Sequence, residues 1–576
     1  MDTHDVEGKY AAASRQRQEH VDAVVAATTG NKIVVAGPGT GKTYLFRQVL
    51  AGKKNTLTLT FVNALVEDLS LELFGLSEVR TLHGFARQQL KKLTQKDVEV
   101  FSKLSAVIRE DAVVLLDNDI DFDPLFYNKS DPDERIEFYR RRRVYYDHYG
   151  FSDMVYAAVR LFEKHPERIP VYSQVVVDEF QDFNAVEVAL IELLASKSPI
   201  LLAGDDDQAL YESLKSASTQ YIRQRYGDVT SGYASFTLPY CSRTTRVIVD
   251  ATNDIISGAA ENGCLRGRIN KPFRYFDEPQ KDKESERNPQ LVYTQVYAAQ
   301  IPWFIQKRVE DIAKEVRDKF TVLLISPTGP KSRQVVNALR EKGFENIHCK
   351  EKQESAEPTL LEGLNLLLKD PVSNLGWRVA TKGLLPDDEF RSLLAKTSDA
   401  DSSGRLRDIL TPERKREVNA LLTLLRAVRD GKSPGDEAHM TDLLKRVGVD
   451  AVGMGTEYLR DHITPPTNRV VDHGIRKVFM RATTIPGSKG LAADYVFITH
   501  FDDLYFIRDK DKNQVSDQDI CGFLVALTRA QKKVFLISSD RKKIPTFLKW
   551  IDDARIHTMK CDLRQKRRAN KRIDQE

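Results

Sequence analysis

A glycine-rich segment at residues 36–43, AGPGTGKT, carries the clearest chemical signal and directly follows a short β-branched run. Gly39 and Gly41 permit backbone angles and close approaches that a side chain would block, so the N–H groups of the turn can surround phosphates. Lys42 would add a positive charge to those phosphates, and the Thr43 hydroxyl would bind Mg²⁺. The segment therefore predicts a P-loop. Its predicted nucleotide-binding residues are Ala36, Gly37, Pro38, Gly39, Thr40, Gly41, Lys42 and Thr43.

Two carboxylates follow another apolar run, in the segment VVVDEFQD at residues 175–182. A P-loop requires an acidic partner at the end of a second strand, and Asp178 is placed there to hold Mg²⁺ through water. Glu179 would orient or deprotonate the attacking water. Alone, an acidic pair after a strand is often a solvated turn. Together with the P-loop, the pair predicts hydrolysis of ATP.

Short apolar runs must form the elements that position these residues, and they fall into two groups. The first group comprises residues 32–36, 56–61, 174–177 and 199–203, and the second comprises residues 321–326, 495–499 and 533–538. Runs that are apolar throughout and alternate with helical segments are typical of buried strands in parallel sheets covered on both faces. The sequence therefore predicts an α/β protein with two domains, each a parallel sheet flanked by helices.

Two long stretches with a helical pattern interrupt this alternation, at residues 91–150 and 356–470. The second stretch holds Leu-rich pieces with apolar spacing near the helical period of about 3.6 residues. We predict that each is a helical insertion in one α/β domain. The first carries an arginine run at residues 140–143 among several tyrosines, which could bind phosphates and stack bases. Alternatively, the run is a solvated helix face that pairs with Asp131, Asp133 and Glu134.

Composition is that of an ordinary globular protein, with 41% apolar and 30% charged residues among 576 and a net charge of +4. The whole-chain charge does not by itself predict a polyanionic partner. The five cysteines are scattered without a C-x-x-C pair, which argues against a disulfide framework or a zinc site. No apolar run approaches the about 20 residues that a membrane span needs, and the N-terminus lacks a signal peptide. A cytoplasmic protein without a membrane partner is expected.

With this organisation, the chain resembles the UvrD/Rep/PcrA-type superfamily 1 DNA helicases along nearly its whole length. The segments that carry the resemblance follow the order of the family's motifs, at residues 15–25 (RQRQEHVDAVV), 36–43, 60–63 (TFVN), 81–85 (TLHGF), 150–155 (GFSDMV), 178–182 (DEFQD), 204–211 (GDDDQALY), 238–256, 484–496 and 525–530. The resemblance implies two RecA-like P-loop motor domains.

The resemblance also implies how the chain is divided. We expect a first motor domain at residues 1–90 and 151–258 with a helical insertion at 91–150, a second motor domain at 259–355 and 471–552 with a helical insertion at 356–470, and a basic C-terminal tail at 553–576.

Roles for individual residues follow from the same resemblance. Gln18 would read adenine, Gln208 would sense the γ-phosphate, and Gly490 in the K-G-L core of the fifth motif would help to bind the nucleotide. Arg243 and Arg529 would reach across from the second domain, because a planar guanidinium stabilises the charge on a transferring phosphoryl group. The predicted catalytic residues are Lys42, Asp178, Glu179, Gln208, Arg243 and Arg529, with Thr43 and Asp178 at the metal. The implied DNA contacts are Phe61, Asn63, Thr81, His83, Tyr211 and Lys489.

The implied activity is ATP-dependent movement along single-stranded DNA, 3′ to 5′, with unwinding of duplex and with ATP and Mg²⁺ as cofactors. Single-stranded and tailed duplex DNA are the implied partners. The chain departs from the family at several motif positions, including Ser213 and Pro486. These departures favour an alternative, a DNA-stimulated regulatory ATPase subunit that serves a nuclease, repair or defence protein without processive unwinding. A P-loop ATPase that is not a nucleic-acid motor is a third possibility.

Overall fold

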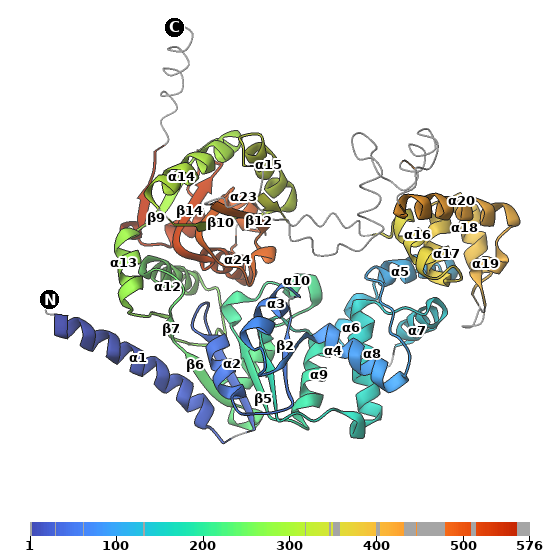
Figure 1. Ribbon diagram of the computed structural model, residues 1–576, viewed down its shortest axis with the longest axis horizontal. Coiled ribbons are helices and arrows are strands. Elements are labelled where there is room, and N and C mark those ends of the chain that lie inside the picture. The colour runs from blue at the N-terminus through green and yellow to red at the C-terminus, as the bar shows by residue number, and fades with distance from the viewer. Residues whose placement is uncertain are drawn as a thin grey trace, which may run out of the picture.

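The computed structural model describes residues 3–28, 30–61, 63–130, 133–316, 318–344, 347–349, 357–398, 404–430, 445, 478–508 and 514–560. Figure 1 shows two α/β bodies, one above the other, and a helical body beside them at the right. Among the described helices, none combines the length and the apolar character that crossing a bilayer requires.

The lower body is built on a six-stranded sheet in the order β3-β2-β4-β5-β1-β6, in which every neighbouring pair is parallel. Its strands are β1 (Asn31–Ala36), β2 (Thr56–Thr60), β3 (Glu78–Thr81), β4 (Gln174–Val177), β5 (Ile200–Gly204) and β6 (Ala234–Leu238). The strands β2, β4 and β5 are buried at every position, as expected for continuous apolar runs covered on both faces. Because the strands are parallel, the P-loop after β1 and the carboxylates after β4 lie at the same edge of the sheet.

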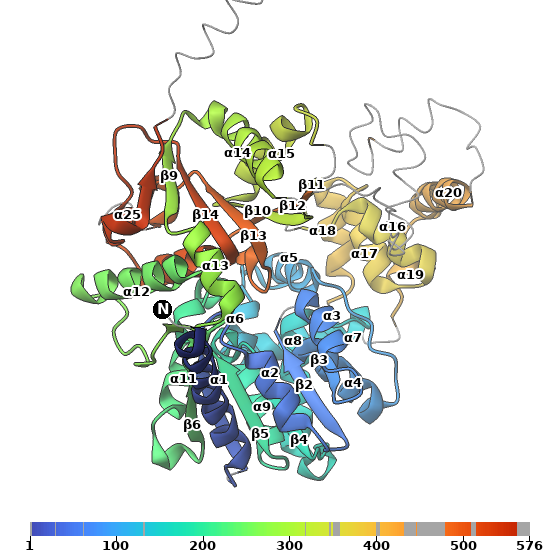
Figure 2. The ribbon, with the colours of Figure 1, turned by 60° about the vertical axis from the view of Figure 1, so that its left-hand side comes forward.

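Helices of the lower body connect these strands and cover the sheet, as Figure 2 shows for α1, α2 and α9. They are α1 (Thr3–Ala26), α2 (Lys42–Leu50), α3 (Asn63–Glu72), α4 (Leu82–Thr94), α8 (Phe151–Lys164), α9 (Ala185–Ala195), α10 (Glu212–Lys215) and α11 (Gln220–Arg225).

The upper body contains a seven-stranded sheet in the order β11-β12-β10-β13-β14-β9-β15, which is again parallel throughout. Its strands are β9 (Leu291–Gln295), β10 (Phe320–Ser326), β11 (Ile347–Cys349), β12 (Val478–Thr484), β13 (Ala493–Thr499), β14 (Ala530–Ser538) and β15 (Ile556–Thr558). The prediction of an α/β fold with two parallel sheets is therefore confirmed.

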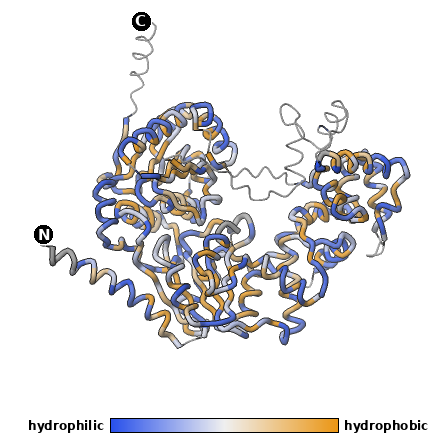
Figure 3. The backbone as a smooth tube through the Cα atoms, in the orientation of Figure 1, coloured by the Kyte–Doolittle hydropathy of each residue, from blue (hydrophilic) through white to orange (hydrophobic). Residues whose placement is uncertain are grey.

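The helices of the upper body surround this sheet. Apolar residues of the helices and of the strands pack together as the core of the body, and Figure 3 shows apolar segments in both. They are α12 (Arg246–Glu261), α13 (Pro279–Arg287), α14 (Ile301–Glu315), α15 (Gly329–Arg340), α23 (Asp503–Phe506), α24 (Asp517–Leu527) and α25 (Thr546–Lys549). A two-stranded sheet of β7 (Tyr240–Cys241) and β8 (Arg274–Tyr275) lies on the connection between the bodies.

Two of the expected domain limits differ from this architecture. The helix α12 packs against α24 and β14 in the core of the upper body, although it precedes the expected start of the second domain at residue 259. The strand β15 pairs with β9, with Ile556 opposite Leu291, although the basic tail was expected from residue 553. Because β15 has only 3 residues, it is too short to show the alternation of apolar and polar residues that marks a strand in a sequence. Residues 561–576 of the expected tail lie outside the described residues.

The helical body at the right combines both expected insertions (Figure 1). The first contributes α5 (Leu104–Leu116), α6 (Asp123–Tyr127) and α7 (Glu134–Tyr146); the second contributes α16 (Leu360–Lys369), α17 (Asn374–Lys382), α18 (Asp387–Ala395), α19 (Leu406–Ile409) and α20 (Pro412–Arg429). Leu104 and Val107 of the first insertion share one apolar core with Leu364 and Trp377 of the second. Apart from residue 445, the rest of the second insertion, from 431 to 470, lies outside the described residues.

A buried ion cluster joins the two insertions. The carboxylate of Asp111 accepts hydrogen bonds from Arg142 Nε at 2.9 Å and from Tyr146 Oη at 2.6 Å. Its other oxygen accepts from Arg378 Nη2 at 2.9 Å, across the interface between the insertions. Arg142 Nη1 also donates to the carbonyl oxygen of Thr397 at 3.1 Å. The side chains of Asp111, Arg142 and Arg378 are at most 4% exposed, so the cluster is removed from solvent.

For Arg142, this cluster corrects both interpretations of the arginine run at residues 140–143. Arg142 is buried and bonded to Asp111, so in this structure its guanidinium contacts neither solvent nor nucleic acid. Arg140 pairs instead with Glu137 on the surface of the same helix. The arginines differ because α7 presents one face to the second insertion and the opposite face to water.

We expect Arg142→Met to lower the free energy of unfolding by about 3 kcal/mol, because it leaves the Asp111 carboxylate buried with one fewer cation. Arg140→Met is the matched control on the same helix, and we expect it to change stability by less than about 0.5 kcal/mol. Urea unfolding followed by tryptophan fluorescence measures both, since Trp377 lies in the shared core. Equal effects of the two substitutions would contradict the buried cluster.

Candidate nucleotide site

The P-loop has the backbone geometry that phosphate binding needs. Gly39 and Gly41 have φ angles of 71° and 96°, in the left-handed region that favours glycine. The Thr40 hydroxyl donates to the carbonyl oxygen of Gly37 at 2.9 Å and holds the turn closed. Gly41 is the N-cap of α2, and within the described residues no side chain caps this helix end. The N–H groups of its first turn are therefore available to an anion, and Lys42 lies on that turn.

The carboxylates predicted after β4 face the P-loop lysine. Lys42 Nζ lies 3.9 Å from Glu179 Oε1, and Asp178 Oδ1 accepts from the backbone N–H of Glu179 at 2.9 Å. Burial and the neighbouring Glu179 raise the pKa of Asp178 above its ordinary value. Burial also opposes ionisation of Glu179, but the ammonium groups of Lys489 and Lys42 outweigh it and lower the pKa of that carboxyl. The pair thus offers hard oxygen ligands that suit Mg²⁺, together with the Thr43 hydroxyl.

Glu179 also has an unusual backbone conformation. Its φ angle is 57°, in the left-handed region that non-glycine residues rarely adopt. Such conformations cost of the order of 1 kcal/mol or more and persist where the surroundings enforce them, often at functional sites. Here, Gln181 Nε2 donates to Glu179 Oε2 at 2.7 Å and fixes the carboxylate after the turn.

Arg529 of the upper body reaches Gln208 of the lower body. Its Nη2 donates to Gln208 Oε1 at 2.9 Å, and Gln208 Nε2 donates to Asp205 Oδ2 at 2.5 Å. Burial and the nearby Arg243 guanidinium lower the pKa of Arg529 to about 9. The guanidinium is therefore desolvated before any substrate binds, which strengthens its interaction with negative charge in the cleft.

Arg243 follows β7 and approaches the P-loop from the side. The N–H of Ser242 donates to the carbonyl oxygen of Gly39 at 3.0 Å. A Cβ atom placed on Gly39 would lie 2.4 Å from Arg243 Cβ, so this glycine is required by its neighbour as well as by its φ angle. The structure thus brings both predicted arginines to the P-loop side of the cleft.

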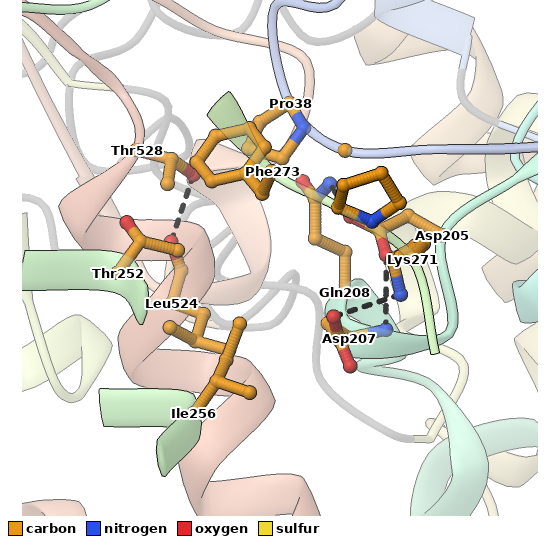
Figure 4. Close-up of a pocket in the computed structure, with 12 residues that line it drawn as sticks. Pro38, Asp205, Asp207, Gln208, Thr252, Ile256, Lys271, Phe273, Leu524 and Thr528 are labelled. Carbon is orange, nitrogen blue, oxygen red and sulfur yellow. Dashed lines mark hydrogen bonds and ion pairs between the residues drawn. The ribbon is translucent and has the colours of Figure 1, made fainter. Parts of the chain in front are cut away.

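A narrow pocket lies between the bodies beside the P-loop (Figure 4). Its apolar wall includes Ile256 of α12 and Leu524 of α24, and its polar wall includes Gln208. Phe273 lies over Pro38 in this view. A Cβ atom on Gly37 would come within 2.8 Å of the Phe273 ring, which therefore lies against the P-loop backbone.

Lys489 was predicted to contact DNA, and its side chain lies among buried polar groups of the lower body. Its Nζ pairs with the Asp182 carboxylate, lies 3.1 Å from Glu179 Oε2 and donates to the carbonyl oxygen of Gln208 at 3.0 Å. The residue is 3% exposed. In this structure its ammonium contacts the buried carboxylates of Asp182 and Glu179, and its contact with DNA stays a prediction. Gly490, at φ 81°, forms the turn that follows.

Gln18 lies on α1 beside the start of α2. Its Oε1 accepts from the Tyr44 hydroxyl at 3.0 Å, and its Nε2 donates to Asp22 at 2.8 Å. Tyr44 immediately follows Thr43, so the structure places the predicted adenine-reading amide next to the P-loop helix.

Of the predicted DNA contacts, Phe61 and Tyr211 come together, with ring centroids 4.8 Å apart. Lys215 Nζ lies 4.3 Å from the centroid of the Phe61 ring. Sequence reasoning did not assign Lys215 a role, although its position four residues after Tyr211 in α10 is the available signal. This group combines aromatic faces with a cation, as single-stranded nucleic-acid sites do.

The remaining predicted DNA contacts have other local roles. The Thr81 hydroxyl accepts from the Gly84 N–H at 3.0 Å and caps α4. Burial, with a smaller contribution from Lys215, lowers the pKa of His83 to about 3, so its imidazole is neutral near pH 7. Asn63 begins α3, and its side chain lies outside the described residues.

The parallel sheets, the P-loop and the carboxylates after β4 define a P-loop protein with two RecA-like bodies. A family model described as an AAA domain matches residues 20–214. The chain is 29% identical over 157 residues to the ATP-dependent DNA helicase PcrA of Staphylococcus aureus (strain Mu50), covering 26% of this chain and 21% of that protein. It is 25% identical over 293 residues to DNA helicase II of Haemophilus influenzae, covering 41% of this chain and 40% of that protein.

The matches therefore span less than half the length of these curated relatives. The match to the AAA domain model includes the P-loop and the carboxylates after β4, which lie within residues 20–214. The predicted resemblance to the UvrD/Rep/PcrA-type superfamily 1 helicases is confirmed.

We expect Gly39→Ala to destabilise the protein and to weaken the binding of a fluorescent ATP analogue. The new Cβ would clash with Arg243, and alanine is strained at the positive φ angle of this position. Gly52→Ala is the matched control, since Gly52 has φ 73° and nothing within 4 Å of an added Cβ. Backbone strain alone should cost Gly52→Ala about 1 kcal/mol, without an effect on the analogue. If both variants bind the analogue equally well, the proximity of Arg243 has no influence on the loop.

Proposed function

We propose that this chain is an ATP-driven motor that moves 3′ to 5′ along single-stranded DNA and unwinds duplex. The observation that carries the proposal is the contact between Arg529 of one body and Gln208 of the other, at 2.9 Å, beside the P-loop and Glu179. A site shared by two bodies changes when they separate or close, so hydrolysis there can be coupled to movement of one body against the other.

We assign each residue of this site a separate role. The P-loop amides and Lys42 bind the phosphates, Thr43 and Asp178 hold Mg²⁺, and Glu179 orients the attacking water and takes its proton. When bound, Mg²⁺ neutralises charge on the phosphates. Gln208 donates a hydrogen bond to the phosphoryl oxygens, and Arg243 and Arg529 donate hydrogen bonds and add positive charge.

Phe61, Tyr211 and Lys215 support the choice of single-stranded DNA as substrate. Each base that stacks on an aromatic ring contributes about 1–3 kcal/mol, whatever its sequence, and Lys215 would contact the backbone. That the relatives bear the names ATP-dependent DNA helicase and DNA helicase II favours a DNA motor over other P-loop activities. A nuclease, repair or defence protein is a further partner class that the family resemblance implies.

We expect Lys42→Ala to lower the ATPase kcat at least about 100-fold, because it removes the cation that holds the phosphates. Lys91→Ala is the control, since Lys91 is an exposed residue of α4 paired with Asp97. Release of phosphate, measured with and without single-stranded DNA, gives the activity. Substantial ATP hydrolysis by the Lys42→Ala variant would contradict the assignment of this chain as a P-loop ATPase.

The motor activity has its own test, strand displacement on duplexes that carry a single-stranded tail at either end. We expect displacement from a 3′-tailed duplex and little from a 5′-tailed one, in an ATP-dependent reaction that Lys42→Ala abolishes. DNA-stimulated ATPase without displacement would contradict the motor and point to a regulatory subunit.

A further inference from the structure

Lys271 is a buried lysine that holds three consecutive aspartates. It lies in the segment between α12 and β8 and is 6% exposed. Its Nζ is 2.9 Å from Asp205 Oδ1, 2.6 Å from Asp206 Oδ1 and 2.8 Å from Asp207 Oδ2. Figure 4 shows the side chain pointing toward Asp205 and Asp207 beside Gln208.

Two arginines complete the charge balance around these aspartates. Arg268 Nε donates to Asp207 Oδ1 at 2.7 Å, and Arg223 Nε donates to Asp206 Oδ2 at 3.0 Å. Three carboxylates are thus matched by three cations at the end of β5. Burial opposes the charged form of Lys271, but attraction by the aspartates outweighs it and raises the pKa of the ammonium. Oxygens from the three aspartates lie within 4.8 Å of one another, a spacing that could suit a metal ion, but here the Lys271 ammonium contacts all three.

A chain of contacts runs from Lys271 to the cleft. Asp205 pairs with Lys271 through Oδ1 and accepts from Gln208 Nε2 through Oδ2, at 2.5 Å. That bond orients the Gln208 amide so that its oxygen faces Arg529 Nη2. The segment that carries Lys271 follows α12, which packs in the core of the upper body. The same segment contributes Ile269 to the apolar core that contains the strands of the lower body. Arg529, at the other end of the chain of contacts, belongs to the upper body.

We propose that Lys271 is a positioning residue for ATP hydrolysis: it holds Asp205 so that the Gln208 amide stays oriented toward Arg529 and the nucleotide. The inference rests on the proposed function. It extends that function by assigning Gln208 a positioning contact, made through Asp205 from the segment between α12 and β8.

A purely structural role for Lys271 is the competing explanation, and a double-mutant cycle distinguishes the two. We expect Lys271→Met to lower the kcat of the full chain about tenfold while KM and the affinity for a fluorescent ATP analogue change less than about threefold. Gln208→Ala should lower kcat by itself, and adding Lys271→Met to it should have little further effect, because Lys271 acts through Gln208. Losses in kcat that multiply independently, or loss of analogue binding, would overturn the proposal.

A second pair of variants guards against simple misfolding. Lys271→Met leaves an excess negative charge in the core, so the thermal unfolding midpoint should fall more than in Lys281→Met, the control for a lysine paired with Glu284 on α13. Adding Asp207→Asn to Lys271→Met removes one negative charge and should restore much of the midpoint. If kcat stays low in that folded double variant, positioning is supported. If kcat returns to the wild-type value, Lys271 only offsets charge and the proposal is overturned.

Failure of the proposed function gives a different result. A wild-type chain that hydrolyses no ATP, with or without single-stranded DNA, contradicts the motor itself. A wild-type chain that hydrolyses ATP, beside a Lys271→Met variant with unchanged kcat, contradicts only the role of Lys271.

Discussion

Burial of charge between the two bodies is the constraint on which the site depends. The strands of the lower body lead into loops that carry buried carboxylates, and cations from both bodies and from the segment between α12 and β8 make that burial tolerable. Lys489 lies among Glu179, Asp182 and the Gln208 carbonyl, and Lys271 lies among three aspartates. A buried charge without a partner costs several kcal/mol, so the contacts of Lys489 with the lower body favour the arrangement of the two bodies in this structure.

Parallel strands explain why so many polar groups meet at one edge. The strands β1, β4 and β5 all end there, and they deliver the P-loop, the Asp178–Glu179 pair and the acidic turn that contains Gln208. Apolar side chains fill the strands themselves, so the polar residues are confined to the loops at the carboxyl ends. The upper sheet presents Arg529 from the opposite kind of edge, because Arg529 lies directly before β14, at the amino ends of the parallel strands. The contact of Arg529 with Gln208 therefore joins the carboxyl edge of the lower sheet to the amino edge of the upper sheet.

Away from the cleft, the two helical insertions form one packed unit. A shared apolar core and the Asp111 cluster join helices that are separated by more than 200 residues in the chain, as in the contact of Arg378 with Asp111. Because the ion cluster is desolvated, its geometry is specific: removal of one partner leaves the others uncompensated. The arginine run at residues 140–143 therefore serves packing through Arg142, while Arg140 remains at the surface.

The sequence by itself determined the local chemistry and the fold class. The P-loop needs glycines at fixed positions, and apolar runs that alternate with helices need parallel sheets, so both were predicted from neighbours in the chain. The acidic pair after β4 followed for the same reason. Only the tertiary structure decided the partners of the long charged side chains. Lys489 pairs with buried carboxylates and donates to the Gln208 carbonyl oxygen, Arg142 is buried, and Lys271, which carried no motif signal, joins three aspartates. Their roles depend on contacts between residues far apart in the chain, which periodicity and spacing do not encode.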